Sequence, residues 1–159
     1  MYFSYVNSPV GDILIAGDEE GLKQVNFSTG KRKTNAASDW IRDDGKLKEA
    51  REQIQAYFKG QLKEFKLKLC PNGTAFQKDV LKALQKIPYG ATRSYSDIAN
   101  AVGKPKACRA VGGANGRNPL AIVIPCHRVI GASGDLTGFG GGLSTKKILL
   151  DLEKRYSQS

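Results

Sequence analysis

The chain has 159 residues, of which 40% are hydrophobic, and this length suits one compact domain or two small domains that share an interface. No apolar run approaches the roughly 20 residues of a transmembrane helix, and the first residues lack the basic start and apolar stretch of a signal peptide. The formal net charge is +10, divided into +2 over residues 1–70 and +8 over residues 71–159, so the second half favours a polyanionic partner without proving one.

Residues 1–70 predict a small α/β domain with an antiparallel sheet. Short apolar segments bounded by turn residues indicate strands, and they lie at 2–6, 13–17, 22–27 and 65–69. The polar segment 28–45 reads as a loop. Apolar positions recur at helical spacing over residues 46–58, and Gly60 ends that pattern. A Pro-Asn-Gly turn at 71–73 marks the expected domain boundary.

Residues 71–159 predict a mostly helical domain that contains a helix-turn-helix of the winged-helix kind. Thr74, with Gln77 three positions later, gives a capping-box pattern at the start of the first helix. Two short helices, predicted over 96–102 and 106–114 and joined by a Gly/Pro turn, suit a helix-turn-helix. Many such helix pairs bind nothing, so this pattern alone does not establish DNA binding.

The end of the chain combines an apolar run, a cysteine and a glycine-rich loop. Residues 120–124 are apolar and of strand length, and they lead into Pro125-Cys126-His127-Arg128. The glycine-rich loop spans 138–142, and a last helix is predicted from residue 144 to about residue 155. Its residues expected to face the core are Ile148, Leu149 and Leu152.

Cys126 is the residue best placed to carry chemistry. A free cysteine is usually a small buried hydrophobe, whereas nucleophilic use requires the thiolate and hence a base or a cationic neighbour. His127 can be that base, directly or through one water, if Glu153 or Asp151 on the last helix orients its imidazole. Adjacent residues on an extended segment point to opposite faces, so adjacency alone leaves both interpretations open.

The cysteine and histidine content argues against a metal or disulfide protein. Cys70, Cys108 and Cys126 form an odd set without a CxxC pair, and His127 is the single histidine. We therefore expect no metal and no disulfide framework. A reducing compartment follows, which is the cytoplasm, or the nucleus if the source is eukaryotic.

Five separated motifs, in order and without a gap, resemble the O6-alkylguanine-DNA alkyltransferases, also called methylated-DNA–protein-cysteine methyltransferases. Residues 125–130 are similar to the family's active-site signature PCHRV, and residues 109–114 to its recognition helix RAVGGA. The other three are Ser94-Tyr95 before the first short helix, Asn118-Pro119 before the apolar run, and Glu153 in the last helix. The resemblance covers residues 74–155 strongly and 1–70 only in general character.

The resemblance implies a single, irreversible transfer of an alkyl group from O6 of guanine in double-stranded DNA to Cys126. It implies that His127, held by Glu153, takes the thiol proton through a water, and that the Tyr95 hydroxyl donates toward N3 of the leaving guanine. The damaged base must first be extruded from the duplex into a pocket. Because the chain is itself the acceptor, we expect no cofactor, and we expect a monomer.

The resemblance also assigns residues to DNA and to the pocket. Arg109 would fill the gap left by the extruded nucleotide, with the recognition helix in the minor groove. Asn118 would tie that helix to the active-site segment. Phe139 and Gly140 stand where several members have tyrosine and serine, which implies backbone contacts to O6 and a roomier pocket for alkyl groups larger than methyl. The remaining expected DNA or substrate contacts are Gly112, Gly113, Ala114, Arg128 and Val129.

Three other functions compete with alkyl transfer. A non-catalytic lesion sensor of the same fold would lack the nucleophile, commonly carrying tryptophan in its place, whereas Cys126 is present. A helix-turn-helix regulator would need side chains that read base edges, yet the second helix is rich in glycine and alanine. A cysteine hydrolase would need an oxyanion hole and normally a histidine apart from the cysteine.

Overall fold

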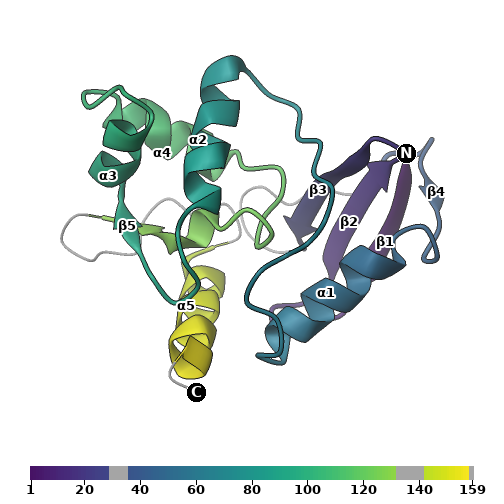
Figure 1. Ribbon diagram of the computed structural model, residues 1–159. Helices are drawn as coiled ribbons and strands as arrows, with labels where there is room; N and C mark the ends of the chain where they lie inside the picture. Colours follow the sequence, from purple (N-terminus) through teal and green to yellow (C-terminus); the bar gives the residue numbers. More distant parts are fainter. Residues whose placement is uncertain (29–35, 132–141, 158–159) are drawn as a thin grey trace.

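The computed structural model describes residues 1–28, 36–131 and 142–157. Figure 1 shows two parts side by side: a sheet with one helix at the N-terminal end, and a group of helices formed by the rest of the chain. The predicted α/β class, with an N-terminal antiparallel sheet and a mostly helical C-terminal part, is confirmed. Within the described ranges no helix is long and apolar enough to cross a membrane.

The N-terminal sheet has the strand order β3-β2-β1-β4, and α1 packs against it. The elements are β1 (Tyr2–Val6), β2 (Ile13–Asp18), β3 (Gly21–Phe27), β4 (Ile41–Arg42) and α1 (Lys48–Phe58). The first three strands pair antiparallel, while the short β4 lies parallel to β1 in a segment predicted as loop. Gly60 follows α1 with φ +72°, and a Cβ there would meet the Tyr156 ring at 2.3 Å, so glycine is required where α1 approaches the last helix.

The predicted strand at 65–69 is wrong, because only one of its residues bridges to the sheet. Leu69 pairs in parallel with Leu22 on the outer edge of β3. The other end of that edge is occupied by a later segment, in which Leu120 bridges to Val25. Two segments therefore share the edge of β3, and neither has room to form a full ladder.

The C-terminal part carries the helix-turn-helix. Its elements are α2 (Ala75–Gln85), β5 (Arg93–Ser94), α3 (Tyr95–Ala101), α4 (Cys108–Gly116), the 3₁₀ turn η1 (Cys126–Arg128), β6 (Val129–Ile130) and α5 (Leu143–Ser157). Thr74 caps α2 by accepting from the Gln77 N–H at 3.1 Å, but the Gln77 side chain donates to Arg117 O instead of closing the box. A complete capping box forms instead at α3, between Ser94 and Asp97.

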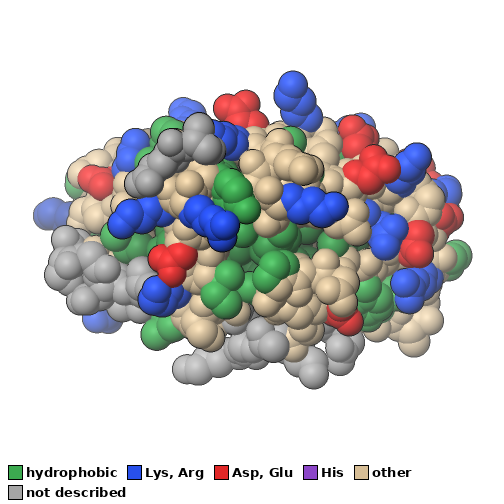
Figure 2. All heavy atoms as spheres, turned by 90° about the horizontal axis from the view of Figure 1, so that it is seen from below, with side chains coloured by type: hydrophobic (Ala, Val, Ile, Leu, Met, Phe, Trp, Pro, Cys, Tyr) green, Lys and Arg blue, Asp and Glu red, His purple; other side chains and the backbone are tan. Residues whose placement is uncertain are grey.

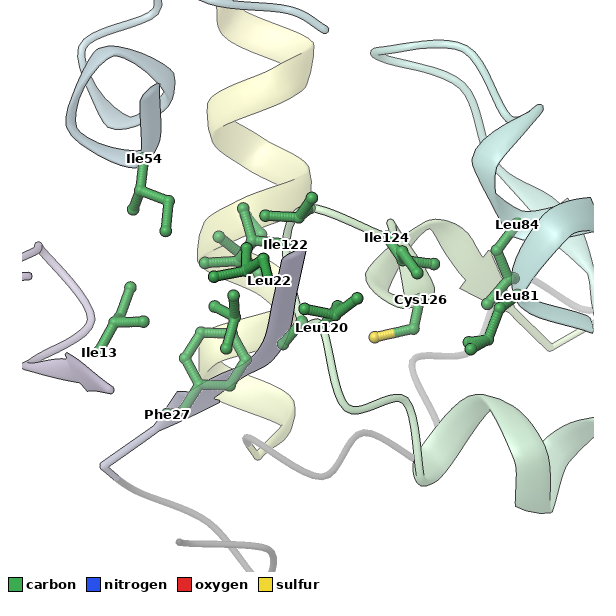
Figure 3. Packing of buried hydrophobic residues seen from close by; sticks show 14 of the residues in the cluster. Ile13, Leu22, Phe27, Ile54, Leu81, Leu84, Leu120, Ile122, Ile124 and Cys126 are labelled. Atoms are coloured by element: carbon green, nitrogen blue, oxygen red, sulfur yellow. The ribbon is translucent and has the colours of Figure 1, made fainter. Parts of the chain in front are cut away.

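The apolar run 120–124 folds into turns rather than the predicted strand. Ile122 has φ +72°, an uncommon conformation for a β-branched residue that requires support from its surroundings. That support is packing, since the side chains of Leu120, Ile122 and Ile124 are at most 1% exposed. Figure 3 shows these three between core residues of the N-terminal sheet and those of α2, so this segment joins the two parts.

The last helix, α5, presents a polar face to the interior. Leu149 is buried as predicted, but Ile148 is 41% exposed, so the expectation that it faces the core is wrong. The buried residues of α5 include Lys146 and Glu153, which are seven positions apart and so share one face of the helix.

Candidate active site

Cys126 lies at the start of η1 and not at the end of a strand. Its side chain is 4% exposed, its N–H donates to Ile124 O, and its carbonyl accepts from Asn115 Nδ2 at 3.3 Å. In the view of Figure 3, the sulfur of Cys126 points toward the side on which Leu120 lies. Because a 3₁₀ turn replaces an extended backbone, the argument that Cys126 and His127 must face opposite sides does not apply.

Burial sets the resting protonation of both groups. It raises the pKa of the Cys126 thiol, against the opposing hydrogen bond from Asn118 and the nearby Lys146 charge. It also lowers the pKa of His127, even though Glu153 favours the charged imidazole. At neutral pH the site therefore rests as a neutral thiol and a neutral imidazole.

Glu153 is the anion at the centre of the site. Its Oε2 lies 2.5 Å from His127 Nε2 and accepts from the Tyr57 hydroxyl at 2.6 Å. Burial would raise the pKa of Glu153, but its bonds to His127 and Arg128 outweigh burial and lower that pKa to about 2. An ionised carboxylate only accepts hydrogen bonds, so Nε2 of the neutral imidazole carries the proton.

The other imidazole nitrogen is left as a base. With the proton on Nε2, Nδ1 of His127 has a free lone pair, and within the described part of the chain it has no hydrogen-bond partner. The imidazole is fully buried, next in sequence to the thiol, and oriented by a carboxylate. This arrangement equips Nδ1 to accept the proton of Cys126.

The structure turns Arg128 inward, which speaks against the DNA contact expected for it. Its side chain is largely buried, and its Nε and Nη2 donate to the two oxygens of Glu153 at 2.7 and 3.1 Å. Its Nη1 donates to Ile87 O at 2.8 Å. A buried carboxylate requires compensation, and this bidentate guanidinium supplies it.

Asn118 connects the end of α4 to the turns before Cys126. Its Nδ2 donates to Ile124 O at 2.8 Å, and its Oδ1 accepts from the Leu120 N–H at 2.9 Å. The two bonds hold both ends of the segment that contains Ile122. Asn115, which donates to the carbonyl of Cys126, was missed by the sequence reasoning, although its place one turn before Asn118 on α4 was a usable signal.

Lys146 was missed as well. It is fully buried, and its Nζ donates to Val129 O at 2.5 Å. Burial lowers the pKa of Lys146 to about 8, although Cys126 acts to raise it. Lys146 lies seven positions before Glu153 and so on the same helix face, and this spacing could have identified it from the sequence. Val129 is itself fully buried, and its carbonyl is the acceptor for Lys146, so its expected substrate contact stays a prediction.

The outer face of α4 carries the residues expected to meet DNA. Arg109 is exposed at the first turn of α4. Gly112 and Gly113 are partly exposed inside the helix, and the Tyr95 ring of α3 lies 3.9 Å from the point where a Cβ on Gly112 would stand. Ala114 is fully buried in this structure, which speaks against its expected contact with DNA or substrate.

The remaining expected pocket residues, Phe139 and Gly140, lie outside the described residues.

Among the residues that are described, no group of three or more His, Cys, Asp and Glu side chains could hold a metal ion. In the view of Figure 2, acidic side chains gather mainly toward the end that carries the N-terminal sheet, while Lys and Arg extend over both parts.

Two family models cover almost the whole chain. Residues 75–155 match the DNA binding domain of 6-O-methylguanine DNA methyltransferase, and residues 1–71 match the ribonuclease-like domain of the same family. A methylated-DNA–protein-cysteine methyltransferase of Methanosarcina acetivorans is 56% identical over 153 residues, covering 96% of this chain and 98% of the relative. That of Mycobacterium tuberculosis strain H37Rv is 47% identical, with 97% and 93% covered.

Solved structures agree with the sequence matches. The crystal structure of M. tuberculosis OGT in complex with DNA has a TM-score of 0.91 at 47% identity, covering 98% of this chain and 94% of that one. The O6-methylguanine-DNA methyltransferase of Pyrococcus kodakaraensis has a TM-score of 0.70 at 26% identity, with 96% and 98% covered. The chain therefore belongs to the 6-O-methylguanine DNA methyltransferase family.

Proposed function

We propose that this protein repairs DNA by transferring an alkyl group from O6 of guanine to the sulfur of Cys126, once per chain. The observation that carries the proposal is the buried His127, next in sequence to Cys126, whose Nε2 is held by the ionised Glu153 and whose Nδ1 has no hydrogen-bond partner among the described residues. Membership of the family supports the same reaction.

The reaction balances without a cofactor. The Cys126 thiol gives its proton to Nδ1 of His127, directly or through one water, and the thiolate attacks the alkyl carbon in line with the O6 bond. A carbon–sulfur bond forms and the carbon–O6 bond breaks, with its electron pair left on guanine. The Tyr95 hydroxyl donates toward N3 of the leaving base. Guanine takes up one proton at N3 through the Tyr95 hydroxyl, and the imidazolium of His127 releases the thiol proton to water, from which Tyr95 is reprotonated. The net result is an alkylated sulfur and a neutral guanine, and the thioether has no ready route back.

The raised thiol pKa keeps Cys126 neutral in the resting protein. Burial disfavours both the thiolate and the imidazolium, so a separated charge pair is costly in the empty site. Glu153 stabilises the imidazolium, and the Lys146 charge and the Asn118 amide stabilise the thiolate. A neutral resting thiol also reacts slowly with other electrophiles, which suits a residue that acts only once.

DNA is the macromolecular partner, and the family model for residues 75–155 describes a DNA binding domain. We assign the exposed face of α4 to the minor groove and Arg109 to the gap left by an extruded O6-alkylguanine. Cys126 is only 4% exposed, so the extruded base must gain access to the sulfur. We further propose that the chain acts as a monomer in a reducing compartment, and that its two domains meet near residues 70–71.

A stoichiometric repair assay tests the proposal. A duplex with one O6-methylguanine is mixed with increasing amounts of protein, and the unrepaired lesion is counted by base analysis. We expect one lesion removed per chain and none with Cys126→Ser, which should still bind the duplex. Tight binding of the lesion without loss of its methyl group would instead assign the protein to the lesion sensors.

A further inference from the structure

The N-terminal part contributes a side chain to the active site. Tyr57, on α1, is fully buried, and its hydroxyl donates to Glu153 Oε2 at 2.6 Å while lying 3.5 Å from His127 Nε2. Glu153 and His127 belong to the C-terminal part, 96 and 70 positions away in sequence. Figure 1 shows the end of α1 turned toward α5, across the junction of the two parts.

The hydroxyl of Tyr57 has a function that core packing does not explain. The ring is fixed by Phe58, Phe65 and Tyr89, with ring centroids 5.3, 5.7 and 6.3 Å away. Phenylalanine would fill this space equally well, since it differs only by the hydroxyl. Burial, and then the Glu153 charge, raise the pKa of Tyr57 well above 10, so the hydroxyl remains a donor.

We propose that Tyr57 is a positioning residue supplied by the N-terminal part, which orients Glu153 and thereby keeps the single histidine in the tautomer that leaves Nδ1 as the base. This inference rests on the proposed alkyl transfer and adds to it a specific role for residues 1–70. Rotation of the carboxylate would break its bond to Nε2. Arg128 holds Oε1 through Nε at 2.7 Å and Oε2 through Nη2 at 3.1 Å, and the Tyr57 hydroxyl adds a shorter bond to Oε2, at 2.6 Å, that opposes this rotation.

If Tyr57 has this role, its removal should change the pH dependence of the repair rate. The titratable and charged groups around His127 and its carboxylate are Glu153 and Lys146 on α5, Arg128 and Cys126 on η1, Tyr57 on α1, and Tyr89 after α2. In Tyr57→Phe, Oε2 loses one donor, so more of its charge acts on the imidazole and the pKa of His127 rises. The acid limb of the rate profile should then move to higher pH.

The test compares Tyr57→Phe with Tyr89→Phe in single-turnover repair of an O6-methylguanine duplex from pH 5 to 9, a range spanning the ordinary histidine pKa of about 6.5. Tyr89 is a matched control, because its hydroxyl is buried and has no hydrogen bond in the described part of the chain. We expect Tyr57→Phe to be about tenfold slower, the effect of one charge-assisted hydrogen bond, with a shifted acid limb. Tyr89→Phe should follow the unaltered protein.

Nitrogen NMR of the histidine supplies a readout that does not depend on repair. Because His127 is the single histidine, imidazole ¹⁵N labelling gives one pair of signals, which distinguish the protonated nitrogen from the other. We expect the Nε2–H form alone in the unaltered protein and a mixture of tautomers in Tyr57→Phe. An unchanged tautomer and pH profile in a Tyr57→Phe protein that repairs DNA would overturn the inference alone, whereas failure of the unaltered protein to repair would overturn the proposed function.

Discussion

The carboxylate of Glu153 lies 2.5 Å from Nε2 of His127, and neither side chain is more than 1% exposed. Replacing the carboxylate by an amide in Glu153→Gln removes the charge that stabilises the imidazolium. We expect alkyl transfer to slow by at least about 100-fold, the lower range of a general base's contribution. Single-turnover repair kinetics measure this change, and binding of an undamaged duplex is the control that should stay constant. A rate within a factor of about two of the unaltered protein would remove Glu153 from the mechanism.

Arg128 should matter for folding and not for DNA affinity. In Arg128→Met the buried Glu153 loses its bidentate partner, and breaking a buried pair of this kind costs about 3–5 kcal/mol of unfolding free energy. Urea unfolding measures the loss. For the fraction that stays folded, the salt dependence of DNA binding should be unchanged, because Arg128 contacts no phosphate. A reduced salt slope with unchanged stability would restore Arg128 to the DNA interface.

Acid should destabilise the protein through Glu153. Its pKa is about 2 in the folded state against an ordinary value of 4.5, so the folded state favours the ionised form. The stabilisation is complete above pH 4.5 and is lost as the pH falls toward 2. Thermal midpoints measured across this range should fall more steeply for the unaltered protein than for Glu153→Gln. Parallel curves for the two proteins would contradict the low pKa.

Arg109 should be needed for duplex DNA in particular. If its side chain fills the gap left by an extruded nucleotide, Arg109→Ala should slow repair of a duplex substrate more than that of a single strand, which has no stack to hold open. Lys106 is exposed just before α4, so Lys106→Ala is the control for a lost charge. It should slow repair of the duplex and of the single strand alike. Equal slowing of both substrates by Arg109→Ala would count against the gap-filling role.

Local sequence signals predicted the elements that depend on local interactions. The strands β1 to β3 and the helices α1 to α5 were predicted within a few residues of their observed bounds, because periodicity, caps and glycine stops are encoded locally. The strand β4 was missed in the predicted loop 28–45, and strands were wrongly predicted at 65–69 and 120–124, two segments that share one edge of β3. Strand formation there depends on partners distant in sequence, which periodicity does not report.

The candidate site, too, could be predicted only where local motifs identify its residues. Residues inside recognisable motifs, such as Cys126, His127 and Glu153, could be assigned from the sequence. The directions of side chains could not, so Arg128 and Ala114 were assigned to DNA although the fold turns them inward. Tyr57 and Lys146 were missed because each occupies an ordinary position on a helix face, and their roles arise only where helices from different regions meet.

Locating the transferred group tests the central claim most directly. The protein is incubated with a duplex carrying isotopically labelled O6-methylguanine, digested, and its peptides are sequenced by mass spectrometry. The account predicts one labelled methyl group per chain, on the sulfur of Cys126, with Cys70 and Cys108 unlabelled. A label on another residue, or an unmodified Cys126 after the lesion has disappeared from the DNA, would contradict it.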